Sequence, residues 1–280
     1  MVNNILTAKT AKPTARSGGI TGDGFDAAFL GNTIHDIDSS DPGLENHGIY
    51  IDGPGSYKIE YNYIHNISGG SGFQAYGDET STGSFVINNV TFDHNWIDHV
   101  AKYCINLVDN AGRGFIVYDN VSSFCRMAGI RLNSSSLEEA RVYNNTFYAG
   151  DSSGDSHYGI IAIDRNLNHN ALSMLNNVFV PWLHMAYKGG DAPLSTFSPS
   201  AYISHNLYFG GTGSHGFDSD PSVKDPDFVD GASCDFHLMP ASNAAGRGSP
   251  VVDAVVTNDF DLVQYLRSQP YSIGAYAYRK

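Results

Sequence analysis

One short pattern recurs along most of this 280-residue chain: an apolar residue, then an asparagine three positions later, then a second apolar residue. The asparagines that carry it are Asn32, Asn62, Asn95, Asn120, Asn145, Asn177 and Asn206. Successive members are 25 to 33 residues apart. Self-similarity at such a period is typical of repeat architectures, in which each repeat forms one layer and the connecting loops vary in length.

Apolar columns flank the asparagine in the repeats. Three positions before it stand Phe29, Ile59, Phe92, Val117, Val142, Met174 and Ile203, and two positions after it stand Ile34, Ile64, Ile97, Ser122, Phe147, Phe179 and Tyr208, which are apolar in all but the Ser122 coil. An asparagine at a corner can adopt the left-handed conformation and hydrogen-bond its equivalents above and below. The pattern therefore predicts an all-β fold, a single-stranded, right-handed parallel β-helix of about seven or more coils.

A second strand precedes the first within each coil. It begins at Gly48 (GIYIDG), Gly72 (GFQAYGD), Cys104 (CINLVDN), Gly129 (GIRLNSS), Gly159 (GIIAIDR) and His184 (HMAYKGG). Because side chains alternate along a strand, the predicted inward residues are Ile49, Ile51, Phe73, Ala75, Ile105, Leu107, Ile130, Leu132, Ile160, Ala162, Met185 and Tyr187. The outward residues form one row of Tyr50, Gln74, Asn106, Arg131, Ile161 and Ala186, and another of Asp52, Tyr76, Val108, Asn133, Ile163 and Lys188.

Charge and apolar runs limit the partners. The formal net charge is −13, from 29 acidic and 16 basic residues, so the surface should repel nucleic acid and anionic membranes, and we expect neither as a partner. The chain has no apolar run long enough to span a membrane, and its N-terminus lacks the apolar core of a secretory signal. The oligomeric state is left open.

The three cysteines, Cys104, Cys125 and Cys234, lack the close spacing of a zinc site or a redox dithiol. We expect Cys104 and Cys125 to be small core residues that can lie on neighbouring coils.

The repeat divides the chain into three parts of one domain. Residues 1–20 break the pattern and are predicted to be a tail or a partial cap, residues 21–230 form the β-helix, and residues 231–280 form a C-terminal cap. Within the cap we predict a short helix from Asn258 to Ser268 and a last strand at IGAYAY, which would cover the open edge of the solenoid.

The repeats GIYIDG and YNYIHNI, together with the ending DPDFVDGASCDFHLMPASNAAGRGSPVVDA and IGAYAY, resemble the bacterial parallel β-helix (pectin-lyase-like) superfamily. This superfamily is rich in polysaccharide lyases, glycoside hydrolases and uronate epimerases. The resemblance covers roughly residues 21–280 and implies a secreted or cell-surface protein that acts on a polysaccharide or oligosaccharide. The paired Asp, Gly-His-Gly and Arg-Ile-Lys segments of polygalacturonases are absent, as is the Asn-Gly-Lys segment of alginate and chondroitin lyases.

Polar and aromatic residues concentrate on the outward rows of the first four coils, so a binding groove is expected there. Tyr50 and Tyr76 could stack on sugar rings. Gln74, Asn106 and Asn133 could bind hydroxyl groups. All five also have an ordinary interpretation as exposed residues of a β-helix.

Three aspartates, Asp52, Asp78 and Asp109, are expected to form an acidic cluster beside Arg131. Ca²⁺ prefers carboxylate oxygens, so the cluster could hold a calcium ion that bridges to a uronate carboxylate. The ion would acidify the C5 proton of the sugar for a base, and β-elimination would follow. Similarity to the general plan of pectate lyases assigns Arg131 as the base, with Lys102, Arg126 and His47 as other candidates.

Two alternatives stay open. In a glycoside hydrolase, two aspartates would act as acid and base, because neighbouring and alternate coils place carboxylates about 5 and 10 Å apart. We therefore predict Arg131, Asp78 and Asp109 as catalytic under one chemistry or the other. A non-catalytic glycan-binding or adhesive module would need only the exposed tyrosines.

Overall fold

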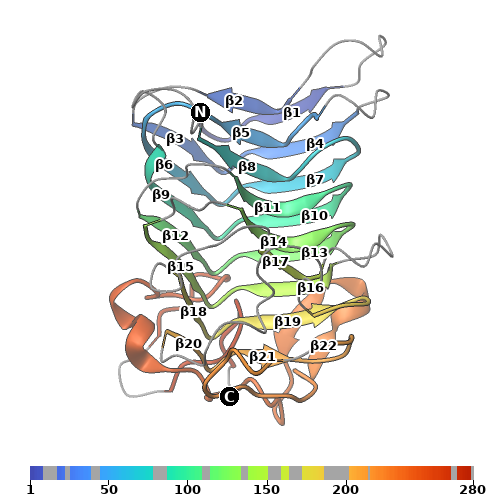
Figure 1. The fold of residues 1–280 in the computed structure, drawn as a ribbon, viewed down its shortest axis with the longest axis vertical. Coiled ribbons are helices and arrows are strands. Elements are labelled where there is room, and N and C mark those ends of the chain that lie inside the picture. Colours follow the sequence, from blue (N-terminus) through green and yellow to red (C-terminus); the bar gives the residue numbers. More distant parts are fainter. Residues whose placement is uncertain are drawn as a thin grey trace.

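The computed structural model describes residues 1–8, 18–22, 26–38, 45–77, 87–108, 114–133, 138–150, 159–163, 172–185, 202–213, 215–265 and 270–278. Its main body is a column of stacked strands, with the C-terminal segment packed along the lower part (Figure 1). Three parallel sheets run along the column. The all-β solenoid predicted from the repeats is therefore confirmed.

The strands of the three sheets are as follows. The long sheet contains β1 (Ile5–Ala8), β4 (Thr33–Ile37), β7 (Tyr63–Ile67), β10 (Trp96–Val100), β13 (Val121–Cys125), β16 (Thr146–Gly150), β19 (Val178–Pro181) and β21 (Leu207–Tyr208). The seven-strand sheet contains β3 (Ala27–Leu30), β6 (Gly55–Glu60), β9 (Ile87–Asp93), β12 (Phe115–Tyr118), β15 (Ala140–Tyr143), β18 (Leu172–Leu175) and β20 (Ile203–Ser204). The six-strand sheet contains β2 (Ile20–Gly22), β5 (Ile49–Ile51), β8 (Phe73–Tyr76), β11 (Tyr103–Val108), β14 (Ala128–Asn133) and β17 (Ile161–Ile163).

Each coil takes one strand from each sheet, so β5, β6 and β7 form one coil and β8, β9 and β10 form the next. The six-strand sheet limits the complete coils in the described residues to six, slightly fewer than the seven or more predicted. Strands of the other two sheets extend the column at its ends.

The predicted apolar columns line the interior. On β5, β8, β11 and β14 the inward residues Ile49, Ile51, Phe73, Ala75, Ile105, Leu107, Ile130 and Leu132 are all fully buried. Aromatic rings stack from coil to coil: Phe147 lies 5.1 Å from Phe179, and Phe179 lies 5.5 Å from Tyr208. Burial of one such side chain contributes about 1.5–3 kcal/mol. These apolar columns therefore supply most of the favourable free energy that stabilises the stacked coils.

A continuous ladder of asparagine side chains joins the coils. The backbone N–H and the Nδ2 of Asn95 both donate to Asn120 Oδ1, at 2.9 and 3.1 Å, and the same pattern repeats at the other predicted positions. The ladder is longer than predicted. Asn4 donates to Asn32 at one end, and Asn206 donates to Asp218 Oδ2 at 2.8 Å at the other.

The left-handed corner residue is the residue before each ladder asparagine, and not the asparagine itself as predicted. These residues, which we call the corner row, are Gly31, Tyr61, His94, Asp119, Asn144, Asn176 and His205, with φ between 50° and 64°. The reason lies in the backbone of the ladder asparagine. Its carbonyl accepts a regular parallel hydrogen bond, for example from Trp96 N to Asn62 O at 2.9 Å, so this residue already belongs to the extended strand.

The register of β17 also differs from the prediction. Arg131 pairs with Ala162, so Ile161 faces the core and Ala162 faces outward, the reverse of the predicted assignment. The segment Gly-Ile-Ile-Ala-Ile offers an apolar residue inward at either register, so alternation alone could not choose between them.

The two ends are built differently from the expectation. Part of segment 1–20 forms β1, which pairs with β4. At the other end Phe217 is fully buried and packs edge-on against Tyr208, which closes the core. The C-terminal segment, residues 225–278, instead lies against the outer face of the long sheet, where Ala275 N donates to Thr146 Oγ1 at 3.0 Å.

The predicted cap elements are wrong in detail. The C-terminal segment contains a small antiparallel pair, β22 (Phe228–Asp230) and β23 (Asp235–Leu238), and two 3₁₀ turns, η3 (Gly231–Ser233) and η4 (Pro250–Ala254). The described part of Asn258–Ser268 forms no helix, because Asn258 bridges to Gln264, and residues 273–278 form no strand. Most of their backbone bonds stay within the C-terminal segment, such as Ile273 N to Ala244 O at 2.9 Å, while Gly274 N donates to Asn176 O of the solenoid at 2.7 Å.

Cys104 on β11 and Cys125 on β13 are both buried, as expected, and they form a disulfide within one coil with a Cα–Cα distance of 5.6 Å. Cys234 is the cysteine outside the bridge. Within the described residues no helix is long and apolar enough to cross a membrane.

We predict that the double variant Cys104→Ala/Cys125→Ala loses about 3 kcal/mol of unfolding free energy. The bridge closes a loop with a sequence separation of 21 residues, and removal of that constraint increases the entropy of the unfolded chain. Denaturant unfolding of the two proteins measures the difference, with Cys234→Ala as the matched control. An unchanged midpoint in the double variant would show that the bridge does not constrain the unfolded chain.

Candidate functional site

The predicted outward row lies on the six-strand sheet. Tyr50, Gln74, Asn106 and Arg131 occupy paired positions on β5, β8, β11 and β14. Parallel pairing therefore holds the four side chains in one line, one per coil. The next position in the row is Ala162, which ends the polar stretch.

A hollow of about 320 Å³ opens at this row. Its lining consists of Glu45, Gln74, Tyr76, Lys102, Tyr103, Asn106, Met127 and Arg131, and we call it the polar pocket. Four of the residues predicted for the site thus line one pocket, and Tyr50 and Asn133 lie on the strands beside them.

Two contacts fix the polar side chains of the row. Asn106 Nδ2 donates to Gln74 Oε1 at 2.8 Å. The Arg131 guanidinium lies 4.8 Å from the centre of the Tyr103 ring, within the range of a cation–π contact. These contacts orient the amide and the guanidinium before any ligand binds.

Within the described residues, two amide oxygens at the site have no hydrogen-bond partner. They are Asn106 Oδ1 and Asn133 Oδ1, and both residues are buried. A buried acceptor without a donor costs about 1–3 kcal/mol. The site is therefore suited to a ligand with hydroxyl or amine donors.

A charged group forms the rim of the pocket. Lys102 Nζ hydrogen-bonds Glu45 Oε1, and His47 Nε2 lies 3.7 Å from Glu45 Oε2. Ser71 N donates to His47 Nδ1 at 3.0 Å, which occupies the lone pair of that ring nitrogen. Burial alone would raise the pKa of Glu45, but the bond and charge of Lys102, with the charges of His47 and Arg131, lower the pKa below its ordinary value. Glu45 is therefore ionised at neutral pH.

The turn before each strand positions this rim. Lys102 N donates to Gly70 O at 3.1 Å, and Met127 N donates to Lys102 O at 2.9 Å, so the turns of successive coils stack on one another. Sequence reasoning missed Glu45, Tyr103 and Met127, because it read only the predicted strands, which began after these residues. The signal that could have found them is their place at the strand starts: Tyr103 is the first residue of β11, and Glu45 and Met127 lie four residues and one residue before β5 and β14.

The predicted acidic cluster is only partly within the described residues. Asp78 and Asp109 lie outside them, and Asp52 follows β5 in a half-buried position. The part of the chain that the structure describes contains no group of three His, Cys, Asp or Glu side chains that could hold a metal ion. Of the other base candidates, His47 stacks on Tyr50 at 5.4 Å, and Arg126 is exposed at the turn before β14.

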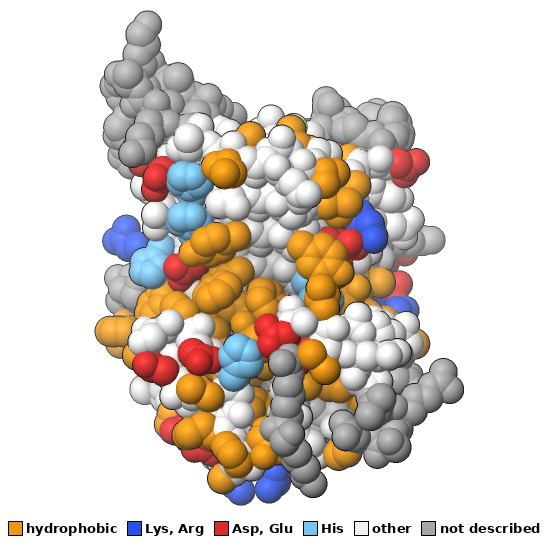
Figure 2. Space-filling model, turned by 180° about the vertical axis from the view of Figure 1, so that it is seen from behind, with side chains coloured by type: hydrophobic (Ala, Val, Ile, Leu, Met, Phe, Trp, Pro, Cys, Tyr) orange, Lys and Arg blue, Asp and Glu red, His pale blue; other side chains and the backbone are white. Residues whose placement is uncertain are grey.

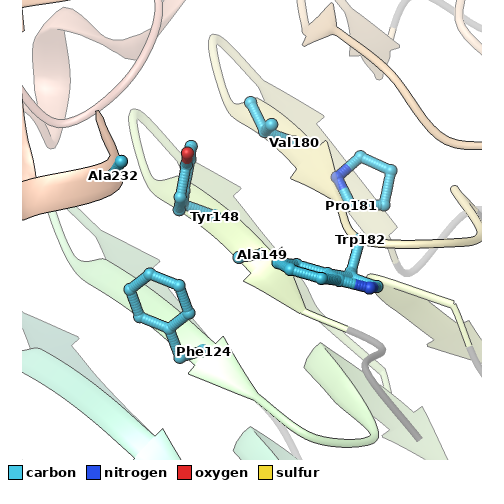
Figure 3. Close-up of a pocket in the computed structure, with 7 residues that line it drawn as sticks. All are labelled: Phe124, Tyr148, Ala149, Val180, Pro181, Trp182 and Ala232. Carbon is cyan, nitrogen blue, oxygen red and sulfur yellow. The ribbon is translucent and has the colours of Figure 1, made fainter. Parts of the chain in front are cut away.

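A second hollow, of about 400 Å³, lies where β13, β16 and β19 end. The side chains of Phe124, Tyr148 and Trp182 bound it, with Ala232 of the C-terminal segment on one side (Figure 3). Trp182 is 61% exposed, although it is a large aromatic residue. We call this hollow the aromatic pocket.

Histidines and hydrophobic side chains also gather on the face seen from behind (Figure 2). His35 and His65 stack with ring centres 5.1 Å apart on the long sheet, and Tyr63 stacks on His65 at 4.3 Å. Burial and then the neighbouring His35 lower the pKa of His65. These histidines pack against one another.

Comparison with known proteins gives one finding. The family model of the right-handed beta helix region matches residues 18–190, more than half of the chain. No curated protein matches the chain.

Proposed function

The chain belongs to the right-handed beta helix family, and from this premise we propose that it is a lyase that cleaves a uronic-acid polysaccharide by β-elimination in the polar pocket. The observation that carries the proposal is the presence of two cations, Arg131 and Lys102, beside the unpaired amide oxygen of Asn106 in one hollow. The chain as a whole has a net charge of −13. An acidic polysaccharide would be repelled by most of the surface and attracted to this pocket.

The lining matches the groups of an acidic sugar. Arg131 presents a planar guanidinium, which can bind a uronate carboxylate through two parallel hydrogen bonds. Asn106 and Asn133 offer acceptors for sugar hydroxyl groups. Tyr50 and Tyr76 supply aromatic faces beside the row for the sugar rings.

β-Elimination breaks the C5–H bond and the C4–O4 bond of the uronate and forms a C4=C5 double bond. Arg131 would hold the carboxylate on C5 and stabilise the charge that develops as the proton leaves. Ionised Glu45 would accept that proton, and the Lys102 ammonium would donate a proton to the leaving O4. Proton transfer from Glu45 to Lys102 through their hydrogen bond would then restore both groups. Because arginine stays protonated, we place Arg131 at the carboxylate and not at the C5 proton.

Calcium at Asp52, Asp78 and Asp109 stays a proposal from the sequence. The described residues include only Asp52 of the three, so they do not form a ligand set for the ion. None of the steps above depends on calcium. The assay below includes calcium and EDTA arms to test the requirement.

The pocket favours a lyase over a glycoside hydrolase. Hydrolysis uses two carboxyl groups that face one glycosidic bond, and Glu45 is the one carboxylate among the described residues of the lining. The aromatic pocket favours a different second candidate, a glycan-binding module. Exposed Trp182 with Tyr148 and Phe124 offers the aromatic platforms that such a module needs.

We also propose that the protein works outside the cytoplasm, either secreted or at the cell surface. Disulfides persist in oxidising compartments and are rare in the cytosol, and the Cys104–Cys125 bridge supports such a setting. A polysaccharide substrate would be met in the same place.

A panel of uronans and neutral polysaccharides, incubated with the protein in calcium or EDTA, tests the function. The lyase produces an unsaturated uronate, so we expect ultraviolet absorbance to rise on an acidic polymer and on no neutral one. New reducing ends without a rise in absorbance would indicate a hydrolase and not a lyase. No change in either readout, together with retention of the protein on an immobilised polysaccharide, would indicate a glycan-binding module and not an enzyme.

A further inference from the structure

The corner row attaches the C-terminal segment to the solenoid. His94 Nε2 bonds Asp259 O at 3.0 Å, Asn144 Nδ2 donates to Ser272 O at 3.1 Å, and Asn176 Nδ2 donates to Ser249 O at 2.9 Å. Each of these side chains uses a donor to satisfy a backbone carbonyl of the segment. The row therefore acts as a line of polar attachments beneath the segment.

Asp119 lies in the same row, between His94 and Asn144, and it breaks this rule. Its side chain is fully buried, and neither carboxylate oxygen has a hydrogen-bond partner in the part of the chain that the structure describes. Asp93 ends the strand of the coil before, and its Oδ1 is also buried without a partner. Three acidic oxygens are thus left unpaired at one place.

The negative charges around Asp119 make an ionised carboxylate at this position still less favourable. Burial first, and then the charges of Asp93 and Asp259, raise the pKa of Asp119 well above its ordinary value. Asp259 accepts bonds from Val263 N at 2.8 Å and from Ala277 N at 3.1 Å, so both of its carboxylate oxygens already have donors. The hydroxyl of partly buried Tyr265 has no hydrogen-bond partner among the described residues, and burial and then the charge of Asp119 raise its pKa.

His94 and Lys58 already have partners. His94 Nδ1 lies 2.7 Å from Asp93 Oδ2 and its Nε2 lies 3.0 Å from the Asp259 carbonyl oxygen, so both ring nitrogens already meet oxygen atoms. Lys58 pairs with Glu60 at 2.7 Å. Buried carboxylate oxygens without a donor are costly, and a bound cation would remove that cost.

We infer that a hard divalent cation, with Ca²⁺ as the best match, binds between Asp119 and Asp93 and clamps the C-terminal segment onto the solenoid. Calcium takes six to eight oxygen ligands in flexible geometry, and carboxylates are the side chains it prefers. The unpaired oxygens of Asp119 and Asp93 would supply the first ligands, and water or backbone carbonyls would complete the set. The site lies under the C-terminal segment, on a different face from the polar pocket, and does not rest on the proposed function.

Thermal melting with calcium, magnesium or EDTA tests the clamp on the wild type and on Asp119→Asn. A ligand at 100 times its Kd stabilises a fold enough to raise the melting temperature by roughly 5 °C or more, and we expect that rise in the wild type. Asp119→Asn should lose the rise and should melt above the wild type in EDTA, because the unpaired charge is gone. Asp52→Asn is the matched control for calcium in the groove and should respond as the wild type does.

Two further measurements keep the inference open to refutation if Asp119→Asn folds poorly. Equilibrium dialysis should find about one calcium ion per chain in the Asp52→Asn variant. Limited proteolysis of the wild type should cut within residues 225–278 faster in EDTA than in calcium. A wild type that shows no metal response in melting, dialysis or proteolysis would overturn the clamp and leave a protonated Asp119 in its place. A full calcium response in Asp119→Asn would overturn it as well.

Discussion

Asn120→Ala is expected to lower the free energy of unfolding by about 4 kcal/mol, more than the disulfide variant does. The Asn120 amide donates to Phe92 O and to Asn145 Oδ1, at 2.8 and 2.9 Å, and accepts from Asn95 N at 2.9 Å. Alanine removes these bonds and leaves Phe92 O and Asn95 N buried without this partner. Each stranded group costs about 1–3 kcal/mol, and the lost side-chain volume adds to the cost.

Denaturant or thermal unfolding measures the effect, and a fall in melting temperature of roughly 10 °C corresponds to it. Asn4→Ala is the matched control, because Asn4 makes the same type of bond to Asn32 at the half-buried start of the ladder. We expect it to cost about 1 kcal/mol. Equal losses in the two variants would mean that the ladder is a surface feature and not the spine of the core.

The stacking of coils could be predicted because its cause is repeated along the sequence. An asparagine between two apolar columns has one compact solution, in which amides bond along the axis and apolar side chains fill the interior, and Asn95 and Asn120 show it. Where the sequence offered two equal solutions the prediction was wrong. At β17, Ile160, Ile161 and Ile163 leave both registers apolar, so the neighbouring coils decide.

The C-terminal segment could not be placed for a related reason. Its attachments depend on side chains that are distant in sequence, such as Asn176 with Ser249 and Thr146 with Ala275. The outer face of the long sheet presents Val121, which is fully buried under this segment. An apolar residue at an outward position was the signal that a cover lies there and not over the end of the column.

The candidate site was predictable to the extent that it lies on strands. Gln74, Asn106 and Arg131 follow from alternation and parallel pairing alone. Glu45 and Lys102 are 57 residues apart and meet because two turns stack, a relation that periodicity does not encode. The mechanism proposed above therefore depends on residues from both classes.

Arg131→Ala is expected to reduce kcat/KM on the uronan identified in the assay by about 10²–10³-fold. Removal of one preorganised group that stabilises developing charge typically has an effect of this size. Arg131→Lys keeps the charge but loses the two parallel hydrogen bonds and the flat contact with Tyr103, so we expect it to recover only part of the loss. The matched control is Arg126→Ala, which removes an exposed arginine from the turn before β14 and should leave turnover unchanged. Circular dichroism checks that each variant is folded. If Arg131→Ala kept more than about a tenth of the wild-type kcat/KM, the guanidinium would not be the group that holds the carboxylate, and Lys102 would be the cation to test in its place.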